Sequence, residues 1–233
     1  MATDTPSHVH VPQFDVLPRT KLRDAAAGQI KAQIIAGTLE PGELYSISTI
    51  SEQLRVSATP VREAVLDLAK DGLVEMVRNR GFRVRVLSDK DLDDIVELRL
   101  VLEIPAMERL AAMRPAPPVE PLRPMARDLV RLAIEGDMVG FVAVDRQFHL
   151  AVTSLLGNER YVSMVALLRD QMRLLGLSGL EGDSELVASA REHEQLLDLI
   201  AAGDVPGTRA LMTKHLQHAR GLWAGRPEDP ADA

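Results

Sequence analysis

Four side chains in the C-terminal half of the sequence have the types and spacing of a metal site. Asp145 and His149 are four residues apart in VDRQFHLAV, so a helix would present both on one face. His193 and His215 lie on either side of the turn AAGD, and two antiparallel helices would bring them to a similar height. Three imidazoles and one carboxylate, without a thiol, suit divalent Zn, Ni, Mn or Fe. The sequence therefore predicts a divalent metal ion at these four residues.

The remaining histidines are not expected to join this site. His218 is displaced from His215 around their common helix, and His8 and His10 lie in a polar N-terminal segment. The sequence contains no cysteine, which excludes disulfides and thiolate ligands. A simpler interpretation makes the histidines ordinary core or surface side chains. The placement of the four candidate ligands on three separate helices argues against it.

Helices are expected to position the four ligands. From Ser88 onward the apolar residues recur at helical spacing, without a strand pattern. Glycine followed by aspartate or asparagine, the Pro-rich segment RPAPPVEPLRP and the glycines between 179 and 182 separate one helix from the next. The sequence thus predicts an all-α bundle. Its helices are expected at 88–113, 122–135, 137–156, 159–178, 184–202 and 204–223.

The N-terminal third predicts a different module, which begins with three helices. A helix over 22–35, the turn LEPGELYS and a short helix with Ser48 as its cap come first. They precede the stretch VSATPVREAVLDLAKDGLV. Within it, Thr59 is expected to cap a helix, Pro60 suits its first turn and Gly72 ends it.

A hairpin is expected to follow this helix. In LVEMVRNRGFRVRVLS the apolar residues alternate on both sides of RNRG, which predicts a two-stranded hairpin with Gly81 near its tip. The order helix, short helix, helix and hairpin is that of a winged helix-turn-helix. Such a module lays the second helix of the pair in the major groove of DNA.

The charge of this module also favours a nucleic-acid surface. The whole chain has a net charge of −7, yet the segment from Arg55 to Lys90 holds eight basic and five acidic residues. Arg62 lies outside the apolar stripe of its helix, and the hairpin carries four arginines that we expect to be exposed: Arg78, Arg80, Arg83 and Arg85. Such a patch suits phosphate contact and entry into the minor groove. A merely solvated hairpin face would show the same pattern.

Length and composition agree with two α-rich domains. The chain has 233 residues, 46% hydrophobic and only 3% aromatic. We expect a flexible tail at 1–18, a winged helix-turn-helix at 19–87, an all-α domain at 88–223 and a disordered tail at 224–233. No apolar run is long enough for a membrane span, and the N-terminal residues lack the order of a secretory signal. A cytoplasmic location is expected.

The stretch VSATPVREAVLDLAKDGLVEMVRNRGFRV resembles the DNA-binding domain of the GntR family of bacterial transcription regulators. The family pattern is roughly V-S-R-T-P-V-R-E-A-L, D/E-G-L-V and N-R-G-F-x-V. The resemblance implies a recognition helix and a wing that bind DNA. Ala58 departs from the pattern because it replaces an arginine that is expected to touch DNA, and Arg55 is a candidate to compensate. The implied DNA-binding residues are Arg55, Ser57, Thr59, Pro60, Arg62, Arg78, Arg80 and Gly81.

The stretches LRLVLEIPAMERLAA, DRQFHLAVTSLLGNERY and EHEQLLDLIAAGD resemble the FCD effector domain of the FadR-like branch of this family. The resemblance covers residues 20–223. It implies that Asp145, His149, His193 and His215 bind a metal, which in turn holds a carboxylate effector. Arg99 is then a candidate partner of the effector carboxylate. An ion pair between Arg99 and Glu103, one helical turn apart, is an equal alternative.

These features predict a DNA-binding transcription regulator, in this family usually a repressor, and not an enzyme. We expect a homodimer on a palindromic double-stranded operator, released by a small organic acid. The long helix from Ser88 directly follows the wing, so a change in its tilt would move the DNA-binding domain. Two alternatives stay open: a metal-dependent hydrolase fused to a DNA-targeting module, and a structural DNA-binding dimer without an effector. For the hydrolase, Glu192 and Glu194 flank His193 but are expected to point away from it.

Overall fold

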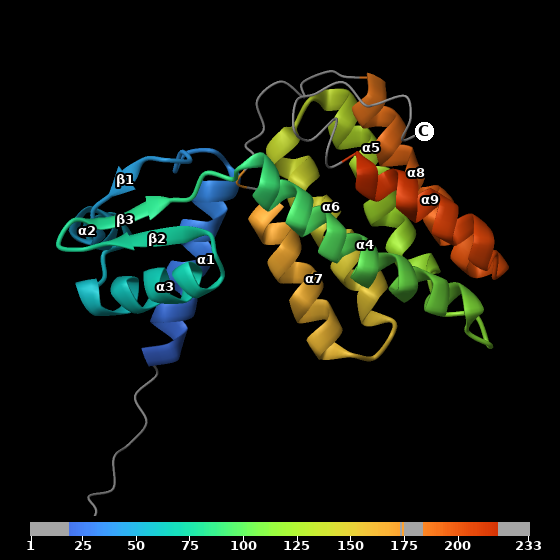
Figure 1. Ribbon diagram of the computed structural model, residues 1–233, viewed down its shortest axis with the longest axis horizontal. Coiled ribbons are helices and arrows are strands. Elements are labelled where there is room, and N and C mark those ends of the chain that lie inside the picture. Colours follow the sequence, from blue (N-terminus) through green and yellow to red (C-terminus); the bar gives the residue numbers. More distant parts are fainter. Residues whose placement is uncertain (1–18, 173, 175–183, 219–233) are drawn as a thin grey trace, which may run out of the picture.

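The computed structural model describes residues 19–172, 174 and 184–218 of the chain. Two lobes lie side by side (Figure 1): an N-terminal lobe with a small sheet, and a helical lobe. The tails predicted at 1–18 and 224–233 lie outside the described residues, as do most of the last turns predicted for the helices at 159–178 and 204–223. Within the described residues, no helix is both long and apolar enough to cross a membrane.

The N-terminal lobe packs three helices against a three-stranded antiparallel sheet. Its elements are α1 (Arg19–Ile35), β1 (Leu44–Tyr45), α2 (Ile47–Leu54), α3 (Ala58–Lys70), β2 (Val74–Val77) and β3 (Gly81–Val84). The apolar face of α3 meets the inner face of the hairpin, and its core includes Val61, Val65, Leu68, Phe82 and Val84. The helix stripe and the strand alternation read from the sequence therefore face one another.

The predicted two-stranded hairpin is part of a larger sheet. The strand order is β1-β3-β2, with Leu44 opposite Arg83 and Tyr45 opposite Phe82. Because β1 is only two residues long, its sequence shows no alternation that could have predicted it. Helix starts also differ by up to three residues from the expected ones, since α1 begins at Arg19 rather than at residue 22. The caps expected at Ser48 and Thr59 are wrong, because α2 begins at Ile47 and α3 at Ala58, so both residues lie inside the first turn of their helix.

The helical lobe contains six α-helices in the described part of the chain, the predicted number. They are α4 (Asp89–Ala112), α5 (Arg123–Glu135), α6 (Met138–Ser154), α7 (Glu159–Met172), α8 (Ser184–Ala202) and α9 (Val205–Gln217). A short 3-10 turn, η1 (Glu120–Leu122), precedes α5. At the start of α4, the Ser88 hydroxyl accepts from the Asp91 amide while the Asp91 carboxylate accepts from the Ser88 amide, so the predicted Ser-Asp cap is confirmed.

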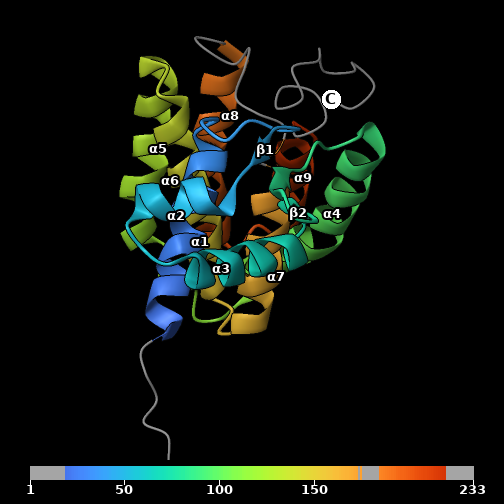
Figure 2. The same ribbon diagram turned by 90° about the vertical axis from the view of Figure 1, so that its left-hand side faces the viewer.

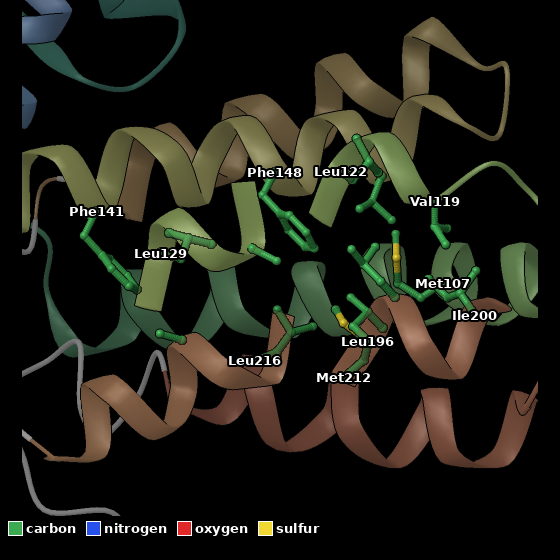
Figure 3. Close-up of a cluster of buried hydrophobic side chains, with 14 of the residues drawn as sticks. Met107, Val119, Leu122, Leu129, Phe141, Phe148, Leu196, Ile200, Met212 and Leu216 are labelled. Carbon is green, nitrogen blue, oxygen red and sulfur yellow. The ribbon is translucent and has the colours of Figure 1, made fainter. Parts of the chain in front are cut away.

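A buried apolar core holds these helices in register. Figure 3 shows its side chains converging from α4, η1, α5, α6, α8 and α9, among them Met107, Leu122, Leu129, Phe141, Phe148, Leu196, Ile200, Met212 and Leu216. Phe148 is fully buried, and its ring meets the ring of His193 edge-on with centroids 4.9 Å apart. The common core thus fixes how α6, α8 and α9 lie relative to one another, and therefore where the histidines on these helices meet.

Candidate metal centre and DNA-binding surface

The four residues predicted as metal ligands come together inside the helical lobe. Asp145 and His149 lie one turn apart on α6, His193 comes from α8 and His215 from α9, and one ligand atom of each lies within 4.8 Å of the others. His149 Nε2 is 3.2 Å from His193 Nε2 and 3.1 Å from His215 Nε2. Asp145 Oδ1 is 3.2 Å from His193 Nε2. The four side chains chosen from helical spacing therefore lie close together in the structure.

The hydrogen bonds around the ring nitrogens test whether the cluster suits a cation. Nδ1 of His193 donates to the Ala190 carbonyl at 3.0 Å, and Nδ1 of His215 donates to Glu192 Oε2 at 2.9 Å. These partners assign the proton to Nδ1 and leave a lone pair on Nε2 of both rings. Nε2 of His149 can donate a proton to at most one of these two lone pairs, so hydrogen bonding alone does not account for the approach of all three nitrogens. Nitrogens bound to one ion at about 2.0–2.1 Å lie roughly 3.0–3.4 Å apart, so the separations fit a divalent metal.

Burial keeps the imidazoles of His149 and His215 in the neutral form that binds metals. Burial lowers the pKa of His149 well below its ordinary value, and the nearby charge of Arg169 acts in the same direction. Burial also lowers the pKa of His215 to about 4. The Nδ1 atom of His149 is buried without a hydrogen-bond partner among the described residues, and Glu103 Oε2 lies 3.9 Å away. At neutral pH the rings of His149 and His215 therefore offer lone pairs rather than positive charges.

A network of buried charges lies behind the ligands. Arg169 on α7 donates to Asp145 Oδ2 at 3.1 Å and to Glu103 Oε2 at 2.5 Å. Arg99 on α4 donates through Nε to Glu103 Oε1 at 2.7 Å, so the ion pair expected as the alternative role of Arg99 is present. Burial would raise the pKa of Glu103, but the two arginines outweigh it and lower the pKa. Burial lowers the pKa of Arg169 to about 10, which leaves it charged at neutral pH.

Sequence reasoning did not find Arg169 or the role of Glu192. Glu192 turns away from His193, as expected, but towards α9, where it accepts from His215 Nδ1 and lies 3.1 Å from His218 Nε2. Burial would raise the pKa of Glu192, but these hydrogen bonds hold it well below its usual range. His218 is thus outside the ligand cluster and one contact away from it. Glu192 orients the ring of His215, as carboxylates behind metal-bound histidines do.

The metal-free protein is expected to lose stability as the pH falls from 6.5 towards 4. In the unfolded chain a histidine titrates near 6.5, whereas the pKa of His215 is about 4 in the folded chain. Between these values only the unfolded chain binds the proton, so the free energy of unfolding decreases by about 1.4 kcal/mol per pH unit for each such group. Urea unfolding with a chelator at pH 7, 6 and 5 measures the slope. A shallower slope is expected for His215→Ala, and equal slopes would contradict the burial effect.

The predicted DNA-binding residues lie on one surface of the N-terminal lobe. Arg55 follows α2 and is exposed, as are Ser57, Thr59 and Arg62 at the start of α3, whereas Pro60 is half-buried. A groove of about 430 Å³ separates the start of α3 from the β2–β3 turn. Its lining brings together four of the predicted residues: Arg62, Arg78, Arg80 and Gly81. The start of α3 and the β2–β3 turn therefore place these three arginines around one groove.

Two of the four hairpin arginines serve the fold as well. The Arg83 guanidinium donates to the Gly42 carbonyl at 2.6 Å. Arg85 was expected to be exposed, which is wrong: it is half-buried and pairs with Asp91 of α4 at 3.5 Å. Arg85 lies one residue beyond β3, where the chain turns towards α4, so strand alternation no longer describes its direction.

Gly81 is required by the close approach of two strands. Its φ is +126°, and a Cβ added there would lie 2.0 Å from the carbonyl oxygen of Tyr45 on β1. A side chain would therefore separate β3 from β1 and displace the wing. The sequence predicted this glycine at the tip of the hairpin, and the structure places it at the first position of β3.

Comparisons with known proteins agree with this architecture. The family model of the FCD domain matches residues 94–218, and that of the gntR family of bacterial regulatory proteins matches residues 22–84. The chain is 32% identical to a probable D-xylose utilization operon transcriptional repressor of Paenarthrobacter nicotinovorans, over 86% of this chain and 88% of that protein. It is 27% identical to the transcriptional regulator LutR of Bacillus subtilis, over 83% of this chain and 97% of that protein.

Solved structures show the same arrangement of elements. Escherichia coli McbR/YncC superposes with a TM-score of 0.74 at 27% identity, over 84% of this chain and 94% of that one. A putative GntR transcriptional regulator from Rhodococcus sp. RHA1 shares the fold with a TM-score of 0.76 at 24% identity, over 88% and 98% of the two chains. The fold predicted from the sequence, a winged helix-turn-helix followed by an all-α domain, is confirmed. The chain belongs to the gntR family of bacterial regulatory proteins, with an FCD domain after the winged helix, and is a DNA-binding transcription regulator.

Proposed function

We propose that the protein is an effector-responsive repressor in which a divalent metal ion at Asp145, His149, His193 and His215 holds a small carboxylate. The observation that carries this proposal is the convergence of three Nε2 atoms and one carboxylate oxygen, with Nδ1 of both His193 and His215 already hydrogen-bonded on the opposite side of the ring. A divalent ion there would supply open coordination positions for carboxylate oxygens. Zn, Ni, Mn and Fe all accept this donor set.

The carboxylate would be small and would meet buried arginines. The hollow bordered by His149, His193, His215 and Leu211 does not admit a sphere the size of a water molecule, so a carboxylate would enter only as these side chains move apart. Arg99 is the proposed partner of the effector carboxylate, and its Nε already donates to Glu103. Glu103 already supplies a carboxylate to Arg99 and Arg169. An effector carboxylate would therefore share these arginines with Glu103.

We propose that a homodimer binds a palindromic operator through residues 19–87 and responds through residues 88–223. One recognition helix reads half a site, and a two-fold operator needs two. The exposed basic surface at Arg55, Arg62, Arg78 and Arg80 supports the DNA contact. Apolar side chains left exposed on the helical lobe support a second copy there: Leu98 is 52%, Val101 65% and Met164 48% exposed.

The hydrolase alternative finds less support. Glu192, the carboxylate beside His215, is held by two imidazoles and also lies 3.1 Å from the Lys214 ammonium. A carboxylate that already accepts hydrogen bonds from a predicted metal ligand and a second histidine is a poor general base, because its oxygens are occupied. The structural-dimer alternative differs in its response, because a dimer without an effector would hold DNA equally well with and without metal and acid.

The test is a gel shift on DNA selected from genomic fragments by the zinc-loaded protein. Small organic acids are then added singly to the complex. We expect at least one acid to weaken operator binding by about 5–150-fold, the range of ordinary allosteric coupling. The release should disappear when a chelator removes the metal. An unchanged operator affinity with every acid, at one bound zinc per chain, would favour the structural dimer instead.

A further inference from the structure

We propose that three consecutive residues near the end of α7, Arg169, Asp170 and Gln171, connect the metal site mechanically to the recognition helix α3. The inference rests on the proposed metal site and concerns how its state reaches the DNA-binding lobe. The orange end of α7 lies at the junction of the two lobes in Figure 1, and α3 crosses in front of α7 in Figure 2.

The first of the three residues contacts a predicted metal ligand. Arg169 donates to Oδ2 of Asp145 at 3.1 Å, while Oδ1 of the same carboxylate lies 3.2 Å from His193 Nε2. Asp145 therefore divides its charge between α7 and the ligand cluster. When Asp145 ligates a cation, less of its charge is left to attract the Arg169 guanidinium, which also lies near the new positive charge. The force that holds α7 against α6 thus depends on the state of the site.

The next residue ties α7 to both lobes. Asp170 is only 3% exposed and accepts from Arg146 of α6, with Nε at 2.6 Å and a terminal nitrogen at 3.0 Å. On its other side it accepts from Lys31 of α1, in the N-terminal lobe. A buried carboxylate between two cations is costly to separate from either one. A movement of α7 would therefore be passed to α1.

The third residue reaches the recognition helix itself. Gln171 donates through Nε2 to the backbone carbonyl of Asp71 at 2.8 Å, and Asp71 is the C-terminal cap of α3. Leu174, just beyond α7, is 2% exposed and belongs to the core of the N-terminal lobe. Because successive helical residues point about 100° apart, one short stretch of helix faces the metal site, the ion pair and α3 at once. The covalent link through α4 follows the wing, whereas α7 touches the helix that is expected to read DNA.

Hydrogen exchange with Zn²⁺ as the only probe tests the connection without an operator or an effector. The wild type, Gln171→Ala and Lys31→Met are compared with Lys21→Met, an exposed lysine on the same helix as Lys31. In all four proteins Zn²⁺ is expected to slow exchange in the peptides of α6, α8 and α9 that carry the ligands. In the wild type and Lys21→Met, exchange at residues 68–73 should also change, by about fivefold or more.

In Gln171→Ala and Lys31→Met the change at residues 68–73 should fall below twofold, although zinc content stays the same. If Zn²⁺ slows exchange at the ligand peptides of the wild type but leaves the exchange rate at residues 68–73 unchanged, the connection is overturned and the metal site stands. A response at 68–73 that is equal in the wild type and in both variants would also overturn it. No response at the ligands would overturn the metal site and the connection together.

Discussion

Purified His149→Ala protein is expected to retain no stoichiometric metal, whereas the wild type should bind one divalent ion per chain. His149 Nε2 lies 3.1–3.2 Å from both other ring nitrogens, so its loss opens the middle of the donor set. Loss of an outer partner of a ligand costs roughly 10–100-fold in metal affinity, and loss of a ligand itself should cost more. Elemental analysis after dialysis against one equivalent of zinc, with a competing chelator for the affinity, measures both.

Two further variants separate the ligands from their supports. Glu192→Gln is expected to weaken metal binding by about 10–100-fold, because Glu192 orients His215 through Nδ1. His218→Ala should keep a full complement of metal, since His218 meets the carboxylate of Glu192 rather than the ligand cluster. Circular dichroism of each variant checks that the helical lobe is folded. Equal metal content in the wild type and in folded His149→Ala would exclude the site as described.

The sequence identified the four candidate ligands because their spacing follows from single helices and one short turn. Asp145 and His149 share a face of α6 whatever α6 packs against. His193 and His215 lie on α8 and α9, a helix pair joined by a turn of two residues, so their relative height was also fixed locally. The period of a helix and the position of its turns were enough to predict this part of the site.

The supporting charges could not be predicted in the same way. Arg169 meets Glu103 across sixty-six residues of sequence, and Asp145 across twenty-four. Such contacts depend on how α7 packs against α4 and α6, which helical periodicity does not specify. Within α8, periodicity correctly turned Glu192 away from His193, but only the packing of α9 shows what it turns towards. The environment of each ligand is therefore tertiary information, even where the ligand itself is not.

The N-terminal lobe shows the same limit at a smaller scale. The apolar stripe of α3 and the alternation of the hairpin were clear, because both patterns arise from burial of one face. The strand β1 could not be recognised in the sequence, since two residues are too few to show an alternating pattern. Arg85 lies where the strand ends, and Asp91 at the start of α4 draws it out of the exposed face. Errors thus occur at the ends of elements, where pairing with distant residues replaces the local period.

Arg62→Ala is expected to weaken binding to the selected operator by about 10–100-fold, equivalent to about 1–3 kcal/mol, and to relax selectivity at one base position. Arg62 is exposed in the first turns of α3 and lines the groove that separates α3 from the wing. The start of a recognition helix is the part that reaches base edges. Fluorescence anisotropy on the operator, and on the same operator with single base changes, measures affinity and selectivity.

Arg80→Ala should act differently, because Arg80 lies in the turn of the wing and is expected to meet phosphate. Its loss should weaken binding to all DNA sequences alike, and it should reduce the slope of log affinity against log salt concentration by about one. Arg131→Ala provides the matched control: Arg131 is an exposed arginine on α5, paired with Asp128 and Glu135, and its loss should leave operator affinity unchanged. Because Arg62 and Arg80 are in the other lobe from the metal site, both variants should keep their zinc. Unaltered operator binding by Arg62→Ala and Arg80→Ala would show that DNA meets a different surface of the protein.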